Sequence, residues 1–344
     1  MKRALILGIT GQDGAYLAQL FLSKGYKVFG TFRRASTPNF WRLMALGLED
    51  KIELISVDLT DMSSMISALE IAQPNEVYNM AASSYVADSF ECPLANLDVT
   101  GMAVARLLEA IRIVNKDIKF YQSSSSEMYG NHCDPQLGAH YEKSRMEPIS
   151  PYGVAKLAAH HLVNIYRQTG MYCVSGILFN HESPLRGLDF VTRKITNTVA
   201  KIKLGLCKDL ILGNISVRRD WGYAPEYMEA VWLMMQQDQP DDYAIGTGVS
   251  HTVEEFAYGT GCIADVKFDI KQNPMLYRPL DIKFLECWTG PTKEKLNWST
   301  KTRFGQLVEI MVKADIQRWT DWQDGKTFPW DAPLYPNEAK VLRR

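Results

Sequence analysis

Two short motifs place acid and base side chains in the first half of the chain. Ser125 and Glu127 lie in a serine-rich run that follows an apolar segment, and Tyr152 and Lys156 open a helix-like segment. A Tyr-x-x-x-Lys spacing puts the phenol and the ammonium one helical turn apart on the same face. Because a nearby cation stabilises phenolate, we expect Tyr152 to act as a base near neutral pH.

The pair of Ser125 and Glu127 adds a second acid/base station. A simple alcohol dehydrogenase needs only one such station. Two stations beside one redox cofactor predict an oxidation that is coupled to a further proton transfer, such as an elimination. Each motif also has a structural interpretation, since Ser123–Ser126 resembles a helix cap and Ser150-Pro151 a helix start. The combination of the motifs favours chemistry.

A glycine-rich loop lies directly after the first predicted strand. The residues from Gly8 to Gly14 read Gly-Ile-Thr-Gly-Gln-Asp-Gly, a variant of the dinucleotide-binding fingerprint. Its glycines permit a tight turn and a close approach of a pyrophosphate to the N-terminus of the next helix. An ordinary turn is the alternative, but the position after the first strand of a βαβ pattern favours a cofactor loop.

The end of the second predicted strand indicates which dinucleotide is used. A preference for NAD usually appears there as an acidic residue that accepts from the ribose hydroxyls, whereas this chain has Arg33 and Arg34. Arginines suit a 2′-phosphate, so we predict NADP; a solvated basic pair is the alternative. Asp58-Leu59 and Met80-Ala81-Ala82 follow the third and fourth predicted strands, where such folds contact the cofactor.

Short apolar runs alternate with amphipathic stretches of helical length. This rhythm predicts an α/β fold with a Rossmann-type, doubly wound parallel sheet and a smaller C-terminal α/β substrate-binding domain. We assign residues 1–180 to the dinucleotide-binding domain, residues 181–330 mainly to the substrate domain with some interleaving of strands, and residues 331–344 to a tail. The predicted strands are Arg3–Leu7, Lys27–Thr31, Ile52–Ser56, Glu76–Met80, Lys119–Ser123 and Tyr172–Leu178, and the predicted helices are Tyr16–Lys24, Ser63–Ala72, Thr100–Ile113, Val154–Gln168, Val191–Leu204 and Pro225–Gln237.

Composition excludes several classes of protein. A net charge of -1 over 344 residues gives no general affinity for nucleic acid or membrane surfaces. The six cysteines are scattered without a Cys-x-x-Cys pair, and the histidines show no metal-ligand spacing. We therefore expect no metal site, a reducing compartment and, since no signal peptide or membrane-length apolar run is present, a cytoplasmic location.

With these motifs, the chain resembles the GDP-mannose 4,6-dehydratase family of extended short-chain dehydrogenase/reductases. The resemblance runs from Gly8 to about Gly248, and more weakly to Trp298. Long, rare strings carry it: Gly-Gln-Asp-Gly at 11–14, Arg-Arg-Ala-Ser at 33–36, Ser-Pro-Tyr-Gly-Val-Ala-Lys at 150–156, Gly-Ile-Leu-Phe-Asn-His-Glu-Ser-Pro at 176–184 and Arg-Asp-Trp-Gly at 219–222.

The resemblance implies an NADP-dependent hydro-lyase and assigns a role to individual residues. Its catalytic set falls on Ser125, Glu127, Tyr152 and Lys156. Cofactor contacts fall on Gly8, Thr10, Gly11, Gln12, Asp13, Gly14, Arg33, Arg34, Asp58, Leu59, Met80, Ala81, Ala82, Ser84, Tyr152, Lys156, His181 and Arg186. Contacts to the nucleotide sugar fall on Ser84, Glu127, Asn180, Lys194, Arg219 and Arg278.

The implied reaction converts GDP-D-mannose into GDP-4-keto-6-deoxy-D-mannose and water. Departures from the family pattern at Ser83–Tyr85, Ala95, Met146–Ile149 and Tyr223 leave a related sugar, such as a GDP-manno-heptose, as an alternative. A 4-epimerase needs no carboxylate base, so Glu127 argues against one. A non-catalytic NADP-binding homologue would be expected to lack Tyr152 or Lys156.

The resemblance also implies an assembly, a homotetramer built as a dimer of dimers. The basic, aromatic segment Arg33–Arg42 would reach a neighbouring subunit, although a loop folded back on its own domain is the alternative. The predicted helices Thr100–Ile113 and Val154–Gln168 are candidates for a four-helix dimer interface. From about Thr320 onward we expect a poorly packed or partner-contacting extension.

Overall fold

The computed structural model describes residues 1–37 and 39–330 of the chain. Its centre is a seven-stranded, wholly parallel sheet with the order β10-β6-β5-β4-β1-β2-β3, and this order confirms the predicted Rossmann-type fold. The strands are β1 (Arg3–Leu7), β2 (Lys27–Phe32), β3 (Glu53–Ser56), β4 (Glu76–Asn79), β5 (Lys119–Ser125), β6 (Cys173–Leu178) and β10 (Asp242–Ile245).

Helices cover both faces of this sheet. One face carries α1 (Gln12–Ser23) and α9 (Ala224–Met235), which pack together. The other face carries α3 (Met62–Ala72), α6 (Ala103–Asn115) and α7 (Pro151–Gln168), with the π-helical turn η1 (Leu97–Met102) leading into α6. The short helices α2 (Trp41–Ala45), α4 (Asp88–Glu91), α5 (Pro93–Asn96) and η2 (Ser126–Tyr129) follow strands β2, β4 and β5.

The first strand shows why the sheet is buried on both sides. Side chains alternate between the faces of a strand. Ala4 and Ile6 therefore pack into the core with α1 and α9, while Leu5 and Leu7 pack into the core with α3 and α6. A strand buried on both faces reads as a continuous apolar run, and that run is what predicted it.

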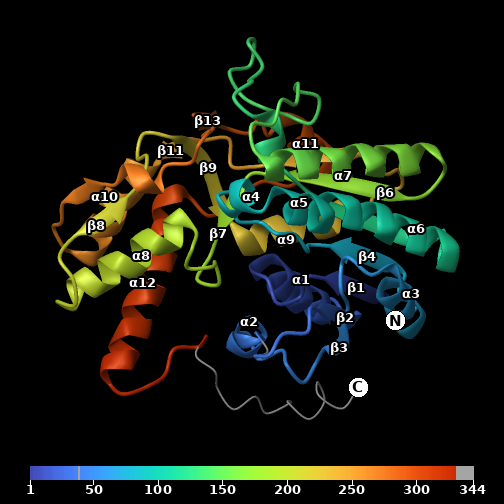
Figure 1. Cartoon of the computed structure of the whole chain (residues 1–344), viewed down its shortest axis with the longest axis horizontal. Coiled ribbons are helices and arrows are strands. Elements are labelled where there is room, and N and C mark those ends of the chain that lie inside the picture. The colour runs from blue at the N-terminus through green and yellow to red at the C-terminus, as the bar shows by residue number, and fades with distance from the viewer. Residues whose placement is uncertain (38, 331–344) are drawn as a thin grey trace.

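A second, smaller unit lies beside the sheet, on the left of Figure 1. Its hydrophobic core, which is separate from the two cores on the faces of the main sheet, is formed largely by α8 (Val191–Lys203), α10 (Val253–Ala264) and α12 (Phe304–Gln323). The strands of this unit are β7 (Asn180–Glu182), β9 (Arg218–Tyr223), β11 (Ser250–Thr252) and β13 (Phe284–Leu285) in one sheet, and β8 (Leu210–Leu212) with β12 (Ile270–Gln272) in another. The turn η3 (Pro274–Leu276) also belongs to it, whereas helix α11 (Gly290–Leu296) packs against β10 and α9 of the first unit.

Several elements differ from their predicted positions. Helix α1 begins at Gln12 instead of Tyr16, because Gly11 in extended conformation already forms its N-cap. Helices α10 and α12 were not predicted. Although α9 and β10 lie beyond residue 180, they return to the first unit, so the division at residues 180 and 181 stays a prediction.

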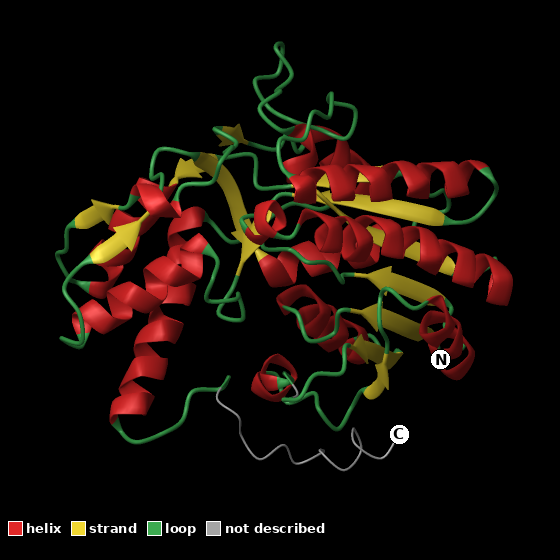
Figure 2. Ribbon diagram, viewed as in Figure 1, coloured by secondary structure: helices red, strands yellow, loops and turns green. Residues whose placement is uncertain are grey.

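The segment that follows α12 packs on its own chain through aromatic rings. Phe328 packs edge-on against Trp319 of α12 at a centroid distance of 4.8 Å and stacks with Trp330 at 4.9 Å. Trp330 then contacts Trp41 of α2 at 5.8 Å, where the chain turns back in Figure 2. These rings pack on their own chain, although most side chains of residues 322–329 are exposed. The expectation of a poorly packed or partner-contacting extension from Thr320 stays a prediction, and the expected tail 331–344 lies outside the described residues.

No helix within residues 1–37 and 39–330 is long and apolar enough to cross a membrane. All six cysteines are free thiols.

The packing of α12 can be tested with a cavity. Met311 is fully buried between α12 and α8. We expect Met311→Ala to lower the free energy of unfolding by about 2 to 5 kcal/mol, measured as a shift in the melting curve. Lys313→Ala on the exposed face of the same helix should cost no more than about 0.5 kcal/mol; equal effects would contradict this packing.

Candidate active site

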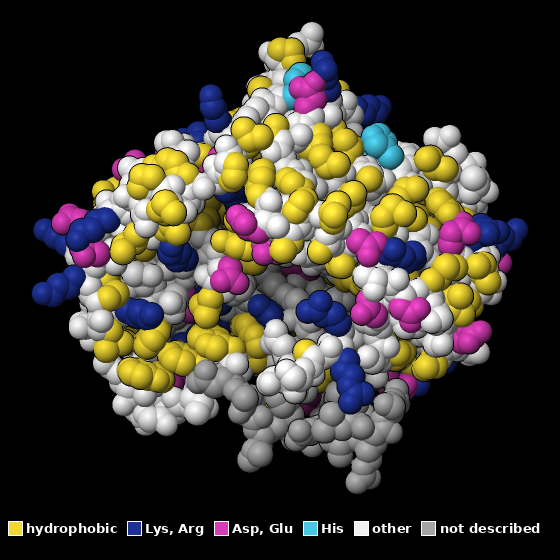
Figure 3. All heavy atoms as spheres, viewed as in Figure 1, with side chains coloured by type: hydrophobic (Ala, Val, Ile, Leu, Met, Phe, Trp, Pro, Cys, Tyr) yellow, Lys and Arg dark blue, Asp and Glu magenta, His cyan; other side chains and the backbone are white. Residues whose placement is uncertain are grey.

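One cavity of about 830 Å³ runs along the carboxyl ends of the main strands and into the second unit. The loops after β1, β2, β4, β5 and β6 all contribute to its wall. Figure 3 shows the hollow near the middle of one face, with Lys and Arg side chains at its rim. A crevice at this edge of a doubly wound sheet is the general position for ligands.

The glycine loop is as tight as a dinucleotide site requires. Gly8 has a positive φ of 81°, and a Cβ there would stand 2.8 Å from the backbone nitrogen of Ala81. A Cβ on Gly14 would meet the Gly8 carbonyl oxygen at 2.4 Å. Only glycine fits both positions, so the backbone lies open to a ligand at the N-terminus of the 12-residue helix α1. These residues fit a dinucleotide cofactor.

A polar network joins the glycine loop to the second unit. His181 of β7 approaches Asp13 with an Nε2–Oδ2 distance of 2.9 Å, and its Nδ1 lies 2.7 Å from the Phe179 carbonyl oxygen. Gln12 donates to the His181 carbonyl at 3.2 Å and accepts from the Ser183 hydroxyl at 2.6 Å. The loop and β7 therefore share one set of hydrogen bonds.

The electrostatics of this network favour a charged pair. Burial alone would raise the pKa of Asp13, but the charge and hydrogen bond of His181, together with Arg186, lower it to about 2. Burial likewise opposes the charged form of His181, but Asp13 outweighs it and raises the pKa of His181 above its ordinary value.

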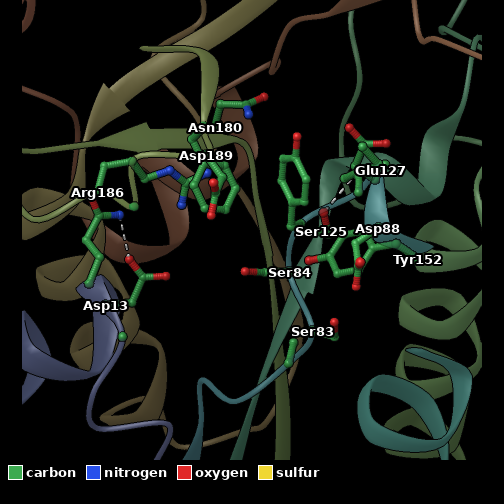
Figure 4. A pocket seen from close by; sticks show the side chains of 18 of the residues that line it. Asp13, Ser83, Ser84, Asp88, Ser125, Glu127, Tyr152, Asn180, Arg186 and Asp189 are labelled. Carbon is green, nitrogen blue, oxygen red and sulfur yellow. Dashed lines mark hydrogen bonds between the residues drawn. The ribbon is translucent and has the colours of Figure 1, made fainter. Parts of the chain in front are cut away.

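The four expected catalytic side chains lie together on the opposite wall. Figure 4 shows Ser125, Glu127 and Tyr152 on the right, facing Asp13 and Arg186 across the cavity. Ser125 accepts from the Glu127 backbone nitrogen at 3.2 Å and so caps η2. Lys156 donates to the Ser123 carbonyl at 2.6 Å, which holds its Nζ 5.7 Å from the centroid of the Tyr152 ring.

The cap at the start of α7 aims two of these side chains. The Ser150 hydroxyl accepts from the Gly153 backbone nitrogen at 3.0 Å, and Pro151 occupies the first helical turn. Tyr152 and Lys156 follow at the first turns and line the cavity. The segment from Ser150 to Lys156 is therefore a capped helix start that also carries the two expected catalytic side chains.

Burial is the largest influence on the pKa values of Tyr152 and Lys156. It raises the pKa of Tyr152 well above the ordinary value; a hydrogen bond with Ser125 opposes the rise, and the charge of Glu127 adds to it. Burial also lowers the pKa of Lys156 to about 8. The expected lowering of the Tyr152 pKa by Lys156 does not prevail in this structure, because both groups are removed from water. A further positive charge beside Tyr152 would favour its ionised form.

Charged side chains of the second unit close the far end of the cavity. Arg278 lies 3.7 Å from the Glu127 carboxylate and 3.6 Å from Asp281, and Arg219 lies 3.1 Å from Asp281. Lys194 and Asn180 line the same end. Asp281 was not foreseen, because nothing in its sequence neighbourhood marks it as the partner of two distant arginines.

The cavity brings together nearly all residues expected from the sequence. Arg34 is the exception, since it is exposed and does not line the cavity described here, whereas Arg33 does. Arg42 lines the cavity but was not expected as a site residue. The other expected residues that line it are Gly8, Thr10, Gly11, Gln12, Asp13, Gly14, Asp58, Leu59, Met80, Ala81, Ala82, Ser84, Ser125, Glu127, Tyr152, Lys156, Asn180, His181, Arg186, Lys194, Arg219 and Arg278.

The departures from the family pattern fall in two groups. Ser83–Tyr85 and Ala95 line the cavity. Met146–Ile149 and Tyr223 are absent from its described lining, since Met146 and Ile149 pack against the core around Met128. The departures at Met146 and Ile149 therefore do not reach the described cavity. Within the described chain, no three His, Cys, Asp or Glu side chains are grouped as around a metal ion.

Comparison with known proteins assigns the chain to a family. The family model for GDP-mannose 4,6 dehydratase matches residues 5–311. The chain is also 44% identical over 329 residues to the GDP-mannose 4,6 dehydratase 1 of Arabidopsis thaliana, covering 92% of this chain and 90% of that one. This chain belongs to the GDP-mannose 4,6-dehydratase family. The resemblance noted from the sequence is thereby confirmed.

Solved structures extend the comparison to the fold. The chain matches the UDP-glucose 4-epimerase of Thermus thermophilus, complexed with NAD, with a TM-score of 0.80 at 23% identity over 91% of this chain and 98% of that one. It matches RMD from Pseudomonas aeruginosa, complexed with NADPH, with a TM-score of 0.76 at 23% identity over 92% and 100%. At such identities the likeness shows the fold of this dehydratase-family member and no more.

The Asp13–His181 pair predicts a pH-dependent stability. The lowered pKa of Asp13 contributes stability above its unfolded value of 3.8 that is lost as the pH falls toward 2. The raised pKa of His181 contributes stability below its unfolded value of 6.5 that is lost as the pH rises through the folded value. Asp13→Asn should therefore cost on the order of 2 kcal/mol near pH ~5.5 and clearly less near pH ~9, measured by thermal unfolding. An equal cost at both pH values would contradict a charged pair.

Proposed function

We propose that this protein is a GDP-mannose 4,6-dehydratase that uses NADP. The observation that carries the proposal is the presence of Glu127 in the same cavity as Ser125, Tyr152 and Lys156, opposite a loop that fits a dinucleotide. A 4-epimerase has no use for the carboxylate, and a non-catalytic homologue has no use for the tyrosine and lysine. The name of the Arabidopsis relative supports GDP-mannose as the substrate.

The choice of NADP rests on the end of β2. Arg33 is exposed there and lines the cavity, and no acidic side chain takes its place. A guanidinium suits a 2′-phosphate better than ribose hydroxyls. Neighbours of the same fold hold NAD in one case and NADPH in another, so the proposal rests on this position of the chain itself.

The proposed reaction begins with oxidation at carbon 4 of the sugar. Tyr152 takes the proton of the carbon 4 hydroxyl. An oxidised nicotinamide cofactor, once bound, would bring a positive charge beside Tyr152, accept a hydride from carbon 4 and later return one to carbon 6. Lys156 is kept in place by the Ser123 carbonyl, beside the tyrosine ring.

The elimination uses the second acid/base station. A ketone at carbon 4 acidifies the hydrogen on carbon 5, and Glu127 removes it as water leaves from carbon 6. Once carbon 6 has received a hydride, a proton returns to carbon 5 and the 4-keto-6-deoxy sugar is complete. Ser125, which contacts both Tyr152 and the Glu127 backbone, hydrogen-bonds the carbon 4 oxygen or helps to protonate the leaving hydroxyl. Arg278 and Arg219 lie where they can bind the diphosphate, and Arg suits such contacts.

A GDP-manno-heptose is the second candidate substrate. Ala95 stands in the cavity wall where the family pattern has a larger tyrosine, and Ser83 and Tyr85, which also line the cavity, depart from that pattern as well. The small side chain leaves room for a longer sugar. Comparison of the two GDP sugars in one assay decides between them.

The proposed assembly is a homotetramer built from dimers. Large apolar side chains are exposed along η1, α6 and α7, namely Met102, Ile113, Val154 and Ile165. Two copies of this face would cover each other and give the expected four-helix interface. Phe40 and Trp41, in contrast, are buried on their own chain, which leaves only the polar part of that segment for a neighbour.

The role of Glu127 is tested by Glu127→Gln. We expect loss of at least ~10²-fold in the rate of water loss from GDP-mannose, followed by mass spectrometry as disappearance of the mass of one water. Reduced cofactor should still form in a single turnover, because Tyr152 is intact, and NADPH binding should be unchanged. Tyr152→Phe should abolish both signals. Dehydration by the glutamine variant at the native rate would contradict the assignment.

The cofactor preference is tested by Arg33→Ser. Loss of a charged hydrogen bond to the 2′-phosphate should weaken NADP binding by about 10- to 100-fold while NAD binding changes little, as measured by calorimetry. Arg34→Ser serves as the comparison, and we expect a smaller effect because Arg34 does not line the described cavity. A native ratio of the two affinities in Arg33→Ser would overturn the proposed role.

A further inference from the structure

Three consecutive backbone carbonyls after β7 all accept hydrogen bonds from guanidinium groups. The Pro184 carbonyl accepts from Arg193 at 2.8 Å and from Arg318 at 2.7 Å. The Arg186 carbonyl accepts from Arg193 at 2.6 Å. The Leu185 carbonyl between them accepts from Arg42 Nε at 2.7 Å. We call residues 184–186 the clamped loop.

One buried carboxylate anchors the clamped loop to the second unit. Asp315 of α12 is 1% exposed and accepts from Arg193 Nε and Nη2 at 3.0 Å each, and from Arg318 at 2.9 Å. The Thr196 hydroxyl completes its shell at 2.6 Å. A buried, fully bonded carboxylate of this kind fixes both arginines and, through them, the carbonyls that they hold.

Arg42 is the one guanidinium of this set that comes from the first unit. It lies on α2, and its Nη1 donates to the Thr10 carbonyl of the glycine loop at 3.0 Å. A single planar group therefore bonds the glycine loop and the clamped loop at once. In the described part of the chain no carboxylate forms an ion pair with Arg42, so backbone oxygens alone receive these two donors.

The position of Arg42 is electrostatically unfavourable. Burial, with Arg193 and Arg186 nearby, lowers the pKa of Arg42 to about 10. The two hydrogen bonds, together with the Trp41 ring 4.4 Å from the guanidinium, hold it there against this repulsion. Trp330 in turn covers Trp41.

The two segments that Arg42 joins are neighbouring parts of one cavity wall, the wall that faces Ser125, Glu127 and Tyr152 in Figure 4. Thr10 and Gly11 line it, as do Arg186, Gly187, Asp189 and Phe190. Arg186 is fixed in turn by Glu182 at 3.1 Å and by the Phe190 ring, whose centroid lies 3.6 Å from the guanidinium. The spacing of these two segments sets the shape of this wall.

We propose that Arg42 is a positioning residue of the cofactor site. Its guanidinium donates to both the glycine loop and the clamped loop and so fixes the spacing between them. This part of the cavity wall therefore has its shape before the dinucleotide binds. This inference rests on the proposed use of a nicotinamide dinucleotide. The planar fork is essential, since a lysine ammonium keeps the charge but does not reproduce two donors in a fixed geometry.

The test compares Arg42→Lys and Arg42→Met with the unmodified protein. The dissociation constant for NADPH is measured by calorimetry on protein freed of nucleotide, and the turnover of GDP-mannose is measured at saturating NADP. We expect both variants to raise the dissociation constant by about 10-fold, as the loss of charged hydrogen bonds predicts. Turnover at saturation should stay near the native value, because Arg42 does not contact the expected reacting groups.

Arg167→Met is the matched control. Arg167 also donates through Nε to a backbone carbonyl, that of Cys173 at 2.7 Å, and it pairs with Asp242 beside β10, at the far edge of the sheet. We expect it to lower the melting temperature without changing NADPH affinity.

The remaining outcomes separate failure of the clamp from failure of the proposed function. Native affinity in Arg42→Lys would reduce the role of Arg42 to its charge. Affinity losses in the Arg42 variants no larger than in Arg167→Met would reduce it to general stability. If the unmodified protein binds no NADPH, both the clamp and the proposed cofactor fail. If it binds NADPH but does not dehydrate GDP-mannose, the proposed function fails while the binding data still judge the clamp.

Discussion

The contact between Asp13 and His181 is the interaction on which the site depends. Asp13 belongs to the glycine loop of the first unit, and His181 belongs to β7, with which the second unit begins. Because the pKa shifts of both side chains favour opposite charges, the pair draws the glycine loop and β7 to one edge of the main sheet. The cavity lies where these two segments meet, and the wall with Ser125, Glu127 and Tyr152 faces them across it.

The wall formed by Ser125, Glu127, Tyr152 and Lys156 shows that one motif can both cap a helix and supply reactive side chains. Ser125 caps η2 and Ser150 caps α7, as their positions in the sequence allow. These caps fix the start of each element and therefore the direction of Glu127 and Tyr152. The structure also shows what spacing alone does not reveal, which is that burial works against ionisation of Tyr152.

The sequence predicted those features that depend on neighbours along the chain. The strands of the main sheet, the glycine loop and the Tyr-x-x-x-Lys face all follow from local pattern. Two helices were missed although signals existed: Thr252 and Glu255 form a capping box at the start of α10, and apolar residues at Phe304, Leu307, Val308 and Met311 have helical spacing. Asp281 and Arg42 could not be found in this way, because their partners lie far along the chain and only the fold brings them together.

The return of β10 to the main sheet has a consequence for synthesis of the chain. β6 is buried along its whole length, and one of its two neighbours is β10, which the ribosome releases only after β7, α8, β8, β9 and α9. Until then β6 presents an unpaired apolar edge to solvent or to another nascent chain. The central sheet is thus completed late, and the part of the second unit from β7 to β9 must emerge before β10 can close it.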